Sequence, residues 1–313
     1  MKQFLGGENI TLMNIRKSFA RPCKILREFI KMLLYCRRSL RYLPPYKLIL
    51  ALVIEILQGG ILSNMIMLCK HNSTIIDLSA KGLLTVLAPD NTLWIIRTNN
   101  LSDTPLGPLL LYLHEPREYQ LFTSIIERGE DLVFIDAGAY IGGYAIRACK
   151  NNSKIIAIEP DPDNYRILME NIKLNKCKDA TVLNVAIGDK DSYVIIYLQS
   201  KEDYGTISLV GGNIPKSVIR VQRLDEIVRA NSHEKFFVKI DVEGYEIEAL
   251  KGMEKLFPAV KYVMVECGIK RCKQVLTLMR SNGFKVLDII CHEVQNLEHI
   301  RGGSFSCNIF FTH

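Results

Sequence analysis

Carboxylates follow three separate apolar runs of the sequence, at points where a buried strand would end. Asp136 follows the first run, Glu159 the second, and Asp241 and Glu243 follow the third. Carboxylates accept hydrogen bonds from hydroxyl and ammonium groups, and a suitably placed one takes a proton from a reacting hydroxyl. The residue types therefore suit the binding of a small polar ligand and acid–base chemistry on it.

The segment VFIDAGAYIGG, residues 133–143, is an apolar run that leads into a glycine-rich turn and then a helical pattern. A strand, a glycine turn and a helix in this order are typical of nucleotide-binding folds. Tyr140 occupies the place where the dinucleotide fingerprint needs its second glycine for a pyrophosphate. The turn therefore favours a ligand with an adenosine but no diphosphate. Asp136 could accept a hydrogen bond from a cationic amino group of such a ligand near the turn.

Glu159 lies 21 residues beyond Gly138, at the end of the next apolar run. A carboxylate at this place in a nucleotide-binding fold accepts hydrogen bonds from both ribose hydroxyls. The alternative is a solvated strand end after an ordinary glycine turn, which the combination of the two features disfavours.

Asp241 and Glu243 are the second and fourth residues of the segment IDVEGYE, and strand alternation would put both side chains on one side. We expect them to contact the substrate hydroxyl and one of them to take its proton, with Asp241 the better candidate for contact with the cofactor. The alternative is helix capping, because acids are favoured at a helix N-terminus. Glu266, after a later apolar run, is a reserve candidate for substrate contact.

Alternating strands and helices after about residue 120 predict a doubly wound, mostly parallel sheet, which would position these carboxylates. No helical pattern separates the last two strands, so they should pair antiparallel. An inserted β segment is expected at 193–198, 206–209 and 218–222. The expected strands are 132–137, 155–158, 181–186, 236–240, 262–266, 284–290 and 306–311, and the expected helices are 142–150, 162–174, 245–256 and 271–282.

Composition and charge exclude several classes of protein. With 48% hydrophobic and 23% charged residues, the 313-residue chain is neither disordered nor a multi-span membrane protein. Residues 1–47 hold eleven Lys/Arg against two acids, so the remaining 266 residues carry 29 bases against 31 acids. A mildly acidic main body argues against a nucleic-acid partner. The six histidines have no ligand spacing, and no metal is expected.

The segment 15–42 has the pattern of a basic amphipathic helix, and a second apolar run covers 48–68. The charged Glu55 and the Gly59-Gly60 pair disfavour a membrane span in that second run. Two hypotheses stay open: residues 15–68 contact an anionic membrane surface, or they form a helical cap on the main body.

Nine cysteines without a C-x-x-C spacing predict neither a disulfide framework nor a zinc site. We therefore expect a reducing, cytoplasmic location, with the inner membrane surface as the alternative. Sequons occur at Asn9, Asn72, Asn100 and Asn151. We give them no weight, because the three-residue motif often arises by chance and glycosylation needs a secretory context that the sequence does not indicate. Residues 74–98 predict a small β element around the turn Pro89-Asp90-Asn91.

Six segments in order resemble the FkbM family of S-adenosylmethionine-dependent methyltransferases over roughly residues 118–311. They are VFIDAGAYIGGY, IIAIEPDPDNYRILMENIKLN, NVAIGD, RLDEI, VKIDVEGYEIEALKGMEKL and VMVEC. The resemblance implies a seven-stranded class I (Rossmann-like) fold and O-methylation of a hydroxyl on a sugar, glycan or related small molecule. It also implies catalytic roles for Asp241 and Glu243 and cofactor contacts by Asp136, Gly138, Ala139, Tyr140, Gly142, Glu159, Pro160 and Ala186.

The expected organisation is a basic helical segment at 1–73, a small β element and linker at 74–117, and the methyltransferase domain at 118–313. The alternative function is a catalytically inactive, membrane-attached protein that binds a nucleoside. An NAD-dependent oxidoreductase is a weaker rival, because Tyr140 stands in the glycine turn.

Overall fold

The computed structural model describes residues 74–78, 83–97, 111–198, 207–208, 214–229, 234–293 and 305–313, with isolated positions at 25, 27, 29, 30, 33, 65 and 109. Contacts divide the chain into two compact units. One comprises Met1–Asn91 and Ile96–Leu101, and the other Thr92–Ile95 and Ser102–His313.

In the first unit, the described residues between 25 and 33 are helical, as the amphipathic pattern predicts, and the rest of 15–68 except Met65 lies outside the described residues. The strands β1 (Thr74–Leu78), β2 (Leu83–Leu87) and β3 (Leu93–Arg97) form the expected small β element, a three-stranded sheet, although residues 93–95 of β3 are counted with the second unit. Among the described residues, no helix is both long and apolar enough to cross a bilayer.

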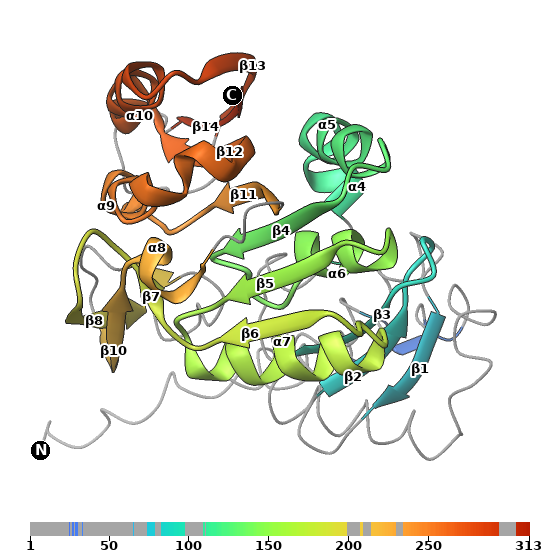
Figure 1. Cartoon of the computed structure of the whole chain (residues 1–313). Coiled ribbons are helices and arrows are strands. Elements are labelled where there is room, and N and C mark those ends of the chain that lie inside the picture. Colours follow the sequence, from blue (N-terminus) through green and yellow to red (C-terminus); the bar gives the residue numbers. More distant parts are fainter. Residues whose placement is uncertain are drawn as a thin grey trace, which may run out of the picture. The chain divides into compact units, whose positions relative to one another are not determined.

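A seven-stranded sheet in the order β13-β14-β12-β11-β4-β5-β6 organises the second unit (Figure 1). Its strands are β4 (Leu132–Ala137), β5 (Lys154–Ile158), β6 (Ala180–Leu183), β11 (Lys235–Ile240), β12 (Val260–Gly268), β13 (Lys285–Glu293) and β14 (Phe305–Thr312). The pairs from β6 through β12 are parallel, whereas β14 runs antiparallel to both β12 and β13. This topology confirms the expected class I fold with its antiparallel strand.

The strand order reverses direction between β4 and β11. Successive strands add outward from β4 to β5 and β6 on one side, and from β11 to β12 on the other. In doubly wound sheets ligands bind at the carboxyl ends of the strands beside such a reversal. The residues that follow Ala137, Ile158 and Ile240 are therefore the candidates for a ligand-binding site.

Helices connect these strands and pack against them. They are α4 (Leu111–His114), α5 (Pro116–Ile126), α6 (Gly143–Lys150), α7 (Pro162–Leu174), α8 (Leu224–Ile227), α9 (Glu246–Lys251) and α10 (Ile269–Ser281), with the 3-10 helix η2 (Glu254–Ala259). α6 contacts β4 and β5, and α10 contacts β12 and β14. The start of α7 follows from the sequence, because Asp161 caps it by accepting from Asp163 N and Pro162 occupies its first turn.

The core on one side of the sheet is an edge-to-face group of aromatic rings. Phe122 of α5 lies 5.2 Å from Phe134 of β4 and 4.9 Å from Tyr144 of α6, measured between ring centroids. Phe134 and Phe237 of β11 are 5.3 Å apart. These contacts fix α5, a helix that the sequence patterns did not predict, over the centre of the sheet.

Two expected elements differ from the structure. The helix expected at 245–256 is split into α9, which ends at Lys251, and the 3-10 helix η2, which begins at Glu254. Gly252 lies between them, and a Cβ there would lie 2.0 Å from the Gly188 oxygen, so this position requires glycine. The strand expected at 181–186 ends at Leu183, and Ala186 belongs instead to β7 (Ala186–Ile187). β7 pairs with β10 (Ile214–Gln222) in a separate four-stranded sheet with β8 (Ser192–Leu198) and β9 (Ile207–Ser208).

The expectation of unpaired cysteines is wrong for four of the six cysteines that the structure describes. Cys149 is bonded to Cys177, and Cys291 of β13 is bonded to Cys307 of β14. The latter two are directly opposite in the strand register. Sequence spacing could not indicate either pair, because 28 and 16 residues separate the partners and only the fold brings them together. The reducing location was inferred from the absence of disulfides, and these two bonds remove that premise.

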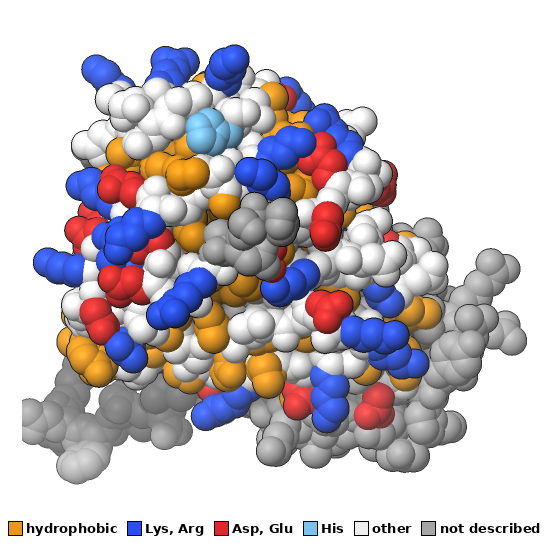
Figure 2. All heavy atoms as spheres, viewed as in Figure 1, with side chains coloured by type: hydrophobic (Ala, Val, Ile, Leu, Met, Phe, Trp, Pro, Cys, Tyr) orange, Lys and Arg blue, Asp and Glu red, His pale blue; other side chains and the backbone are white. Residues whose placement is uncertain are grey.

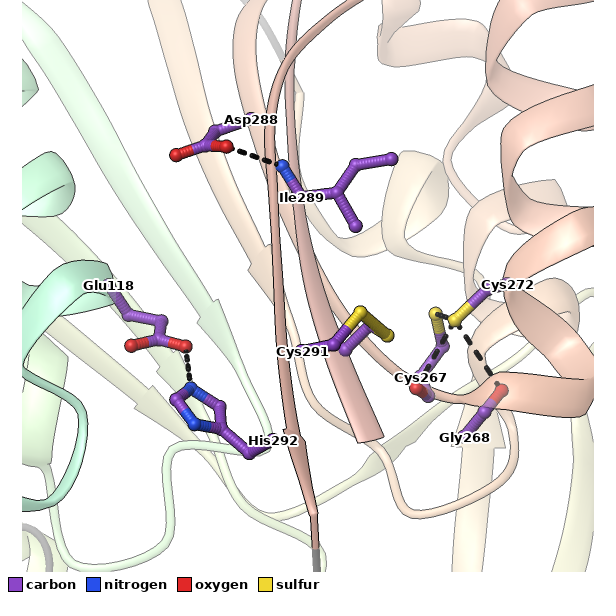
Figure 3. Close-up of a disulfide and its surroundings, with 9 residues drawn as sticks. Glu118, Cys267, Gly268, Cys272, Asp288, Ile289, Cys291 and His292 are labelled. Atoms are coloured by element: carbon purple, nitrogen blue, oxygen red, sulfur yellow. Dashed lines mark hydrogen bonds and ion pairs between the residues drawn. A yellow bond between two sulfur atoms is a disulfide. The ribbon is translucent and has the colours of Figure 1, made fainter. Parts of the chain in front are cut away.

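A further pair of sulfurs lies close to the second disulfide (Figure 3). Cys267 at the end of β12 and Cys272 in the first turn of α10 are free thiols, with 2.7 Å between their sulfurs. Cys267 is also opposite Cys307 in the strand register. The same figure shows buried Glu118 of α5 in contact with His292 of β13.

On the face seen in Figure 2, Lys and Arg side chains are interspersed with Asp and Glu. This distribution agrees with the nearly balanced charge of the sequence after residue 47.

Candidate active site at the strand ends

The turn after β4 is held against both neighbouring strands. Gly138 N and Ala139 N donate to the Ile158 carbonyl, each at 2.9 Å. Gly138 has φ +87°, and a Cβ at this position would lie 1.7 Å from the backbone oxygen of Asp241. Glycine is therefore required here by the close approach of the chain after β11, as well as by the backbone angle.

Glu159 joins this turn to the turn after β5. Its Oε2 accepts from Tyr140 N at 2.8 Å, and its Oε1 accepts from Asp161 N at 2.9 Å. Burial raises the pKa of Glu159 to about 8, although these hydrogen bonds oppose the rise. The structure thus brings together Tyr140 and Glu159, two residues selected from the sequence, and we call residues 138–142 and 159–161 the paired turns.

Asn184 supports the second of the paired turns, and the sequence patterns did not single it out. Its side-chain amide donates to the carbonyls of Glu159 and Pro160, at 2.8 and 2.9 Å. Glu159 N donates in turn to the Leu183 carbonyl at 3.0 Å. The carboxylate of Glu159 is therefore fixed from both its side chain and its backbone.

Asp136 lies beneath the first of the paired turns and is 1% exposed. Its Oδ2 accepts from Ala145 N at 3.1 Å, whereas its Oδ1 has no hydrogen-bond partner among the described residues. Burial raises the pKa of Asp136 to about 6, and attraction to Lys239 partly offsets that rise. A buried acceptor without a donor is costly unless a ligand supplies one.

A buried ammonium group lies at the centre of the site. Lys239 is 4% exposed, donates from Nζ to Asp241 Oδ2 at 2.8 Å, and lies 5.1 Å from the centroid of the Tyr144 ring. Burial lowers the pKa of Lys239, but the attraction of Asp241 and Asp136 outweighs it and keeps that pKa above its ordinary value. Lys239 is thus a permanent cation under the carboxylates, and it was not selected from the sequence.

Glu266 is the neighbour of Asp241 on the next strand. The parallel register pairs Ile240 with Val265, so the two residues that follow, Asp241 and Glu266, lie side by side. Repulsion from Asp241, followed by burial, raises the pKa of Glu266 well above its ordinary value. A carboxyl group that holds its proton more strongly than usual is a better base once ionised.

Glu115 enters the same cluster from the start of α5. It accepts a hydrogen bond from the Tyr144 hydroxyl, and burial raises its pKa. Residues 115 and 144 belong to different helices and no local pattern links them, so sequence inspection could not find this contact. We call Glu115, Tyr144, Lys239, Asp241 and Glu266 the charged cluster.

Glu243 occupies a different backbone setting from the one expected. β11 ends at Ile240, and Glu243 has φ +48° in a turn, so strand alternation does not determine its direction. The residue is exposed, and its charge still contributes to the raised pKa of Glu266. Its predicted role depends on this turn rather than on a shared strand face.

Two further sequence-selected residues, Ala186 and Gly142, are explained by packing. Ala186 is buried with Ile196, Ile219 and Val221 in the inserted four-stranded sheet. Gly142 caps α6 at φ +107°, where a Cβ would come within 2.9 Å of the Ile146 side chain. Among the described residues, no group of three or more His, Cys, Asp or Glu side chains could hold a metal ion.

Residues 136–286 match the family described as the methyltransferase FkbM domain. A curated relative, the hexuronic acid methyltransferase AglP of Haloferax volcanii, is 31% identical over 141 residues. The match covers 45% of this chain and 57% of the relative, so this chain spans little more than half of that protein.

Solved structures with a similar arrangement include two methyltransferases of low sequence identity. The precorrin-6y C5,15-methyltransferase of Geobacter metallireducens is 14% identical with a TM-score of 0.38, and the match covers 62% of this chain and 87% of that chain. TYW2 of M. jannaschii, in complex with AdoMet, is 15% identical with a TM-score of 0.39, over 76% of this chain and 90% of that chain.

Proposed function

From the premise that residues 136–286 form a methyltransferase FkbM domain, we propose that this chain transfers the methyl group of S-adenosylmethionine to a hydroxyl oxygen. The proposed acceptor is a sugar, a glycan or a related small molecule. The observation that carries the proposal is the arrangement of Asp136, Asp241 and Glu266 at the carboxyl ends of β4, β11 and β12, where a doubly wound fold binds ligands.

Asp136 and the paired turns fit S-adenosylmethionine in their hydrogen-bonding capacity. The unpartnered Oδ1 of Asp136 is a buried acceptor that suits an ammonium donor such as the amino group of the cofactor. The two Glu159 oxygens accept backbone N–H groups from Tyr140 and Asp161 and a side-chain hydrogen bond from Asn164, which leaves one of their four acceptor positions for a ribose hydroxyl. The proposed contacts are those inferred from the sequence: Asp136, Gly138, Ala139, Tyr140, Gly142, Glu159, Pro160 and Ala186.

When bound, this cofactor supplies an electrophilic methyl group on a sulfonium centre. A hydroxyl oxygen that attacks the methyl carbon must lose its proton, so a nearby carboxylate has to accept it. Asp241 is the proposed contact for that hydroxyl, and Lys239 holds its carboxylate in place. The proton passes to Asp241 or to Glu266, whose raised pKa makes it the stronger base. Glu243, in the turn that follows β11, is the proposed further contact for the substrate.

A sugar acceptor is supported by the curated relative, which is named as a hexuronic acid methyltransferase. Hydroxyl groups on a sugar ring match a site built from carboxylates, because each hydroxyl can donate to one of them.

The test is transfer of a labelled methyl group from S-adenosylmethionine to glucuronic acid and to mixed glycans by the full chain. Asp241→Asn should lower the transfer rate by about 10²–10⁴-fold, because it removes a positioned proton acceptor. Glu248→Gln, at a half-buried acid of α9, is the matched control and should keep the rate.

An Asp241→Asn variant with full activity would remove Asp241 from the mechanism. Binding of the cofactor by the wild-type chain without transfer to any acceptor would favour the alternative, a membrane-attached protein that binds a nucleoside.

Contact of residues 15–68 with a membrane surface is a further part of the proposal. In the described positions of this segment, Ile30 and Leu33 are 48% and 38% exposed on a helix. Exposed apolar residues among basic ones suit an anionic lipid surface. Charge reversal of Arg37 and Arg38 to Glu should reduce sedimentation of the full chain with phosphatidylserine vesicles; unchanged sedimentation would refute the contact.

A further inference from the structure

Asn151 is the one sequon asparagine that falls within the described ranges. It begins Asn151-Asn152-Ser153, in the turn between α6 and β5. Asn151 and Asn152 are both exposed, and Asn152 has φ +64°. Acceptor asparagines for N-linked glycans lie on surface turns of this kind, in proteins that pass through a secretory compartment.

The compartment is indicated by the disulfides of the same domain. The bond between Cys149 and Cys177 begins two residues before Asn151 and joins the last turn of α6 to the segment after α7. Its Cα–Cα distance of 5.7 Å lies in the usual range for a disulfide. The Cys291–Cys307 bond joins two strands of the main sheet and has a Cα–Cα distance of 4.0 Å, which is shorter than the usual range. Disulfides form and persist in oxidising compartments and are rare in reducing ones.

We propose that this domain matures in an oxidising compartment that also assembles N-glycans, and that Asn151 carries a glycan there. The proposal replaces the cytoplasmic location expected from the sequence, whose basis was the absence of disulfides. It does not depend on methyl transfer; if both hold, S-adenosylmethionine must reach the same compartment.

The modification suits the local hydrogen bonding. The donor substrate is an oligosaccharide linked through a diphosphate to a polyprenyl lipid. A bond forms between Asn151 Nδ2 and the anomeric carbon, the bond from that carbon to the diphosphate oxygen breaks, and one amide proton is released. In the fold, Nδ2 uses one N–H to donate to the Arg147 carbonyl at 3.0 Å. The glycosylated amide keeps one N–H, so this bond persists.

The position also keeps a glycan clear of the proposed active site. α6 starts at Gly143 beside the paired turns and ends at Lys150, and β5 starts at Lys154. The turn between α6 and β5, which contains Asn151, therefore lies at the amino-terminal edge of the parallel strands, opposite their carboxyl ends. Figure 1 shows the two elements that the turn connects. Both functions are compatible in one molecule.

The experiment translates the full chain with rough microsomes, once unmodified and once behind a cleavable secretion leader. Peptide N-glycosidase treatment in H₂¹⁸O marks each occupied asparagine, and unreduced peptide mapping identifies the disulfides. We expect an ¹⁸O-labelled aspartate at 151 in the unmodified chain, its loss in Asn151→Gln and Ser153→Ala, and its retention in Asn152→Gln. The Cys149–Cys177 and Cys291–Cys307 peptides should appear linked.

The other results overturn the proposal. Labelling of residue 151 only in the chain with the added leader would refute the compartment, because the protein would not enter it unaided. Labelling of 151 in neither chain would refute the site, whatever happens at the other sequons. Free thiols at all four cysteines in the translocated chain would refute the argument from disulfides.

Discussion

The paired turns and the charged cluster both use buried carboxylates, but they satisfy them differently. In the paired turns Glu159 is held by two backbone N–H groups, and its neighbour Asp161 is bound by Asp163 N and by Lys216. In the charged cluster Glu115 accepts from the Tyr144 hydroxyl, whereas Asp241 and Glu266 depend on one buried ammonium group, Lys239, and repel each other. The first region is therefore preorganised by its own backbone, whereas the second stores electrostatic strain that a substrate proton can relieve.

Gly138→Ala should damage both regions, because Gly138 is the point where they touch. A Cβ there would overlap the Asp241 carbonyl at 1.7 Å, and φ is +87°. We expect a loss of roughly 4 kcal/mol or more in the free energy of unfolding, measured by urea denaturation. Gly268→Ala is the control, since no atom lies within 4 Å of its Cβ position; equal stability of the two variants would contradict the close approach.

Lys239→Met tests whether the charged cluster depends on its cation. Removing the ammonium group leaves Asp241 and Glu266 repelling each other, so we expect a loss of about 3–5 kcal/mol near neutral pH. The loss should shrink as the pH falls, because Glu266, whose pKa is raised by repulsion from Asp241 and by burial, takes up a proton and the repulsion ends. Lys235→Met, at an exposed residue of the same strand, should change stability by less than about 0.5 kcal/mol. A pH-independent loss would indicate a packing effect instead.

Glu159→Gln tests burial in the paired turns through pH dependence. The folded pKa of about 8 lies above the ordinary 4.5, so the fold favours the protonated form and loses stability as pH rises toward 8. The amide has no such dependence. We expect the stability of the variant relative to wild type to improve by about 3 kcal/mol between pH 5 and 7, measured by urea denaturation. A constant difference would contradict a raised pKa at Glu159.

Lys216→Met should have the smallest effect and completes the comparison of the two lysines. Lys216 contacts Asp161, but its side chain is 14% exposed against 4% for Lys239, and Asp161 keeps its bond from Asp163 N. We expect a loss of about 1–2 kcal/mol, well below that of Lys239→Met. Equal losses of unfolding free energy in the two variants would mean that the paired turns depend on a lysine as strongly as the charged cluster does.

The same difference explains how much could be predicted from the sequence. β4 and α7 have the predicted bounds, because an apolar run that ends at the glycine turn defines one and the Asp161-Pro162 cap defines the other. Glu159 and Tyr140 could be selected because a local turn pattern carries them. The charged cluster could not be assembled in this way, since Glu115, Lys239 and Glu266 meet only through strand register and helix packing.

The break at Gly252 and the two disulfides were missed for a related reason. Gly252 is fixed by the approach of Gly188, 64 residues earlier in the chain, and each disulfide joins cysteines that no motif connects. Periodicity reports which face of an element is buried, but it contains no information on which distant segment covers that face.

Isothermal titration of the full chain with S-adenosylmethionine, and separately with NAD, tests the central claim most directly. We predict binding of S-adenosylmethionine alone, lost in Glu159→Ala and kept in Glu170→Ala, at an exposed acid of α7. Binding of NAD, or the same affinity for S-adenosylmethionine after replacement of Glu159, would contradict the assignment of the paired turns as its site.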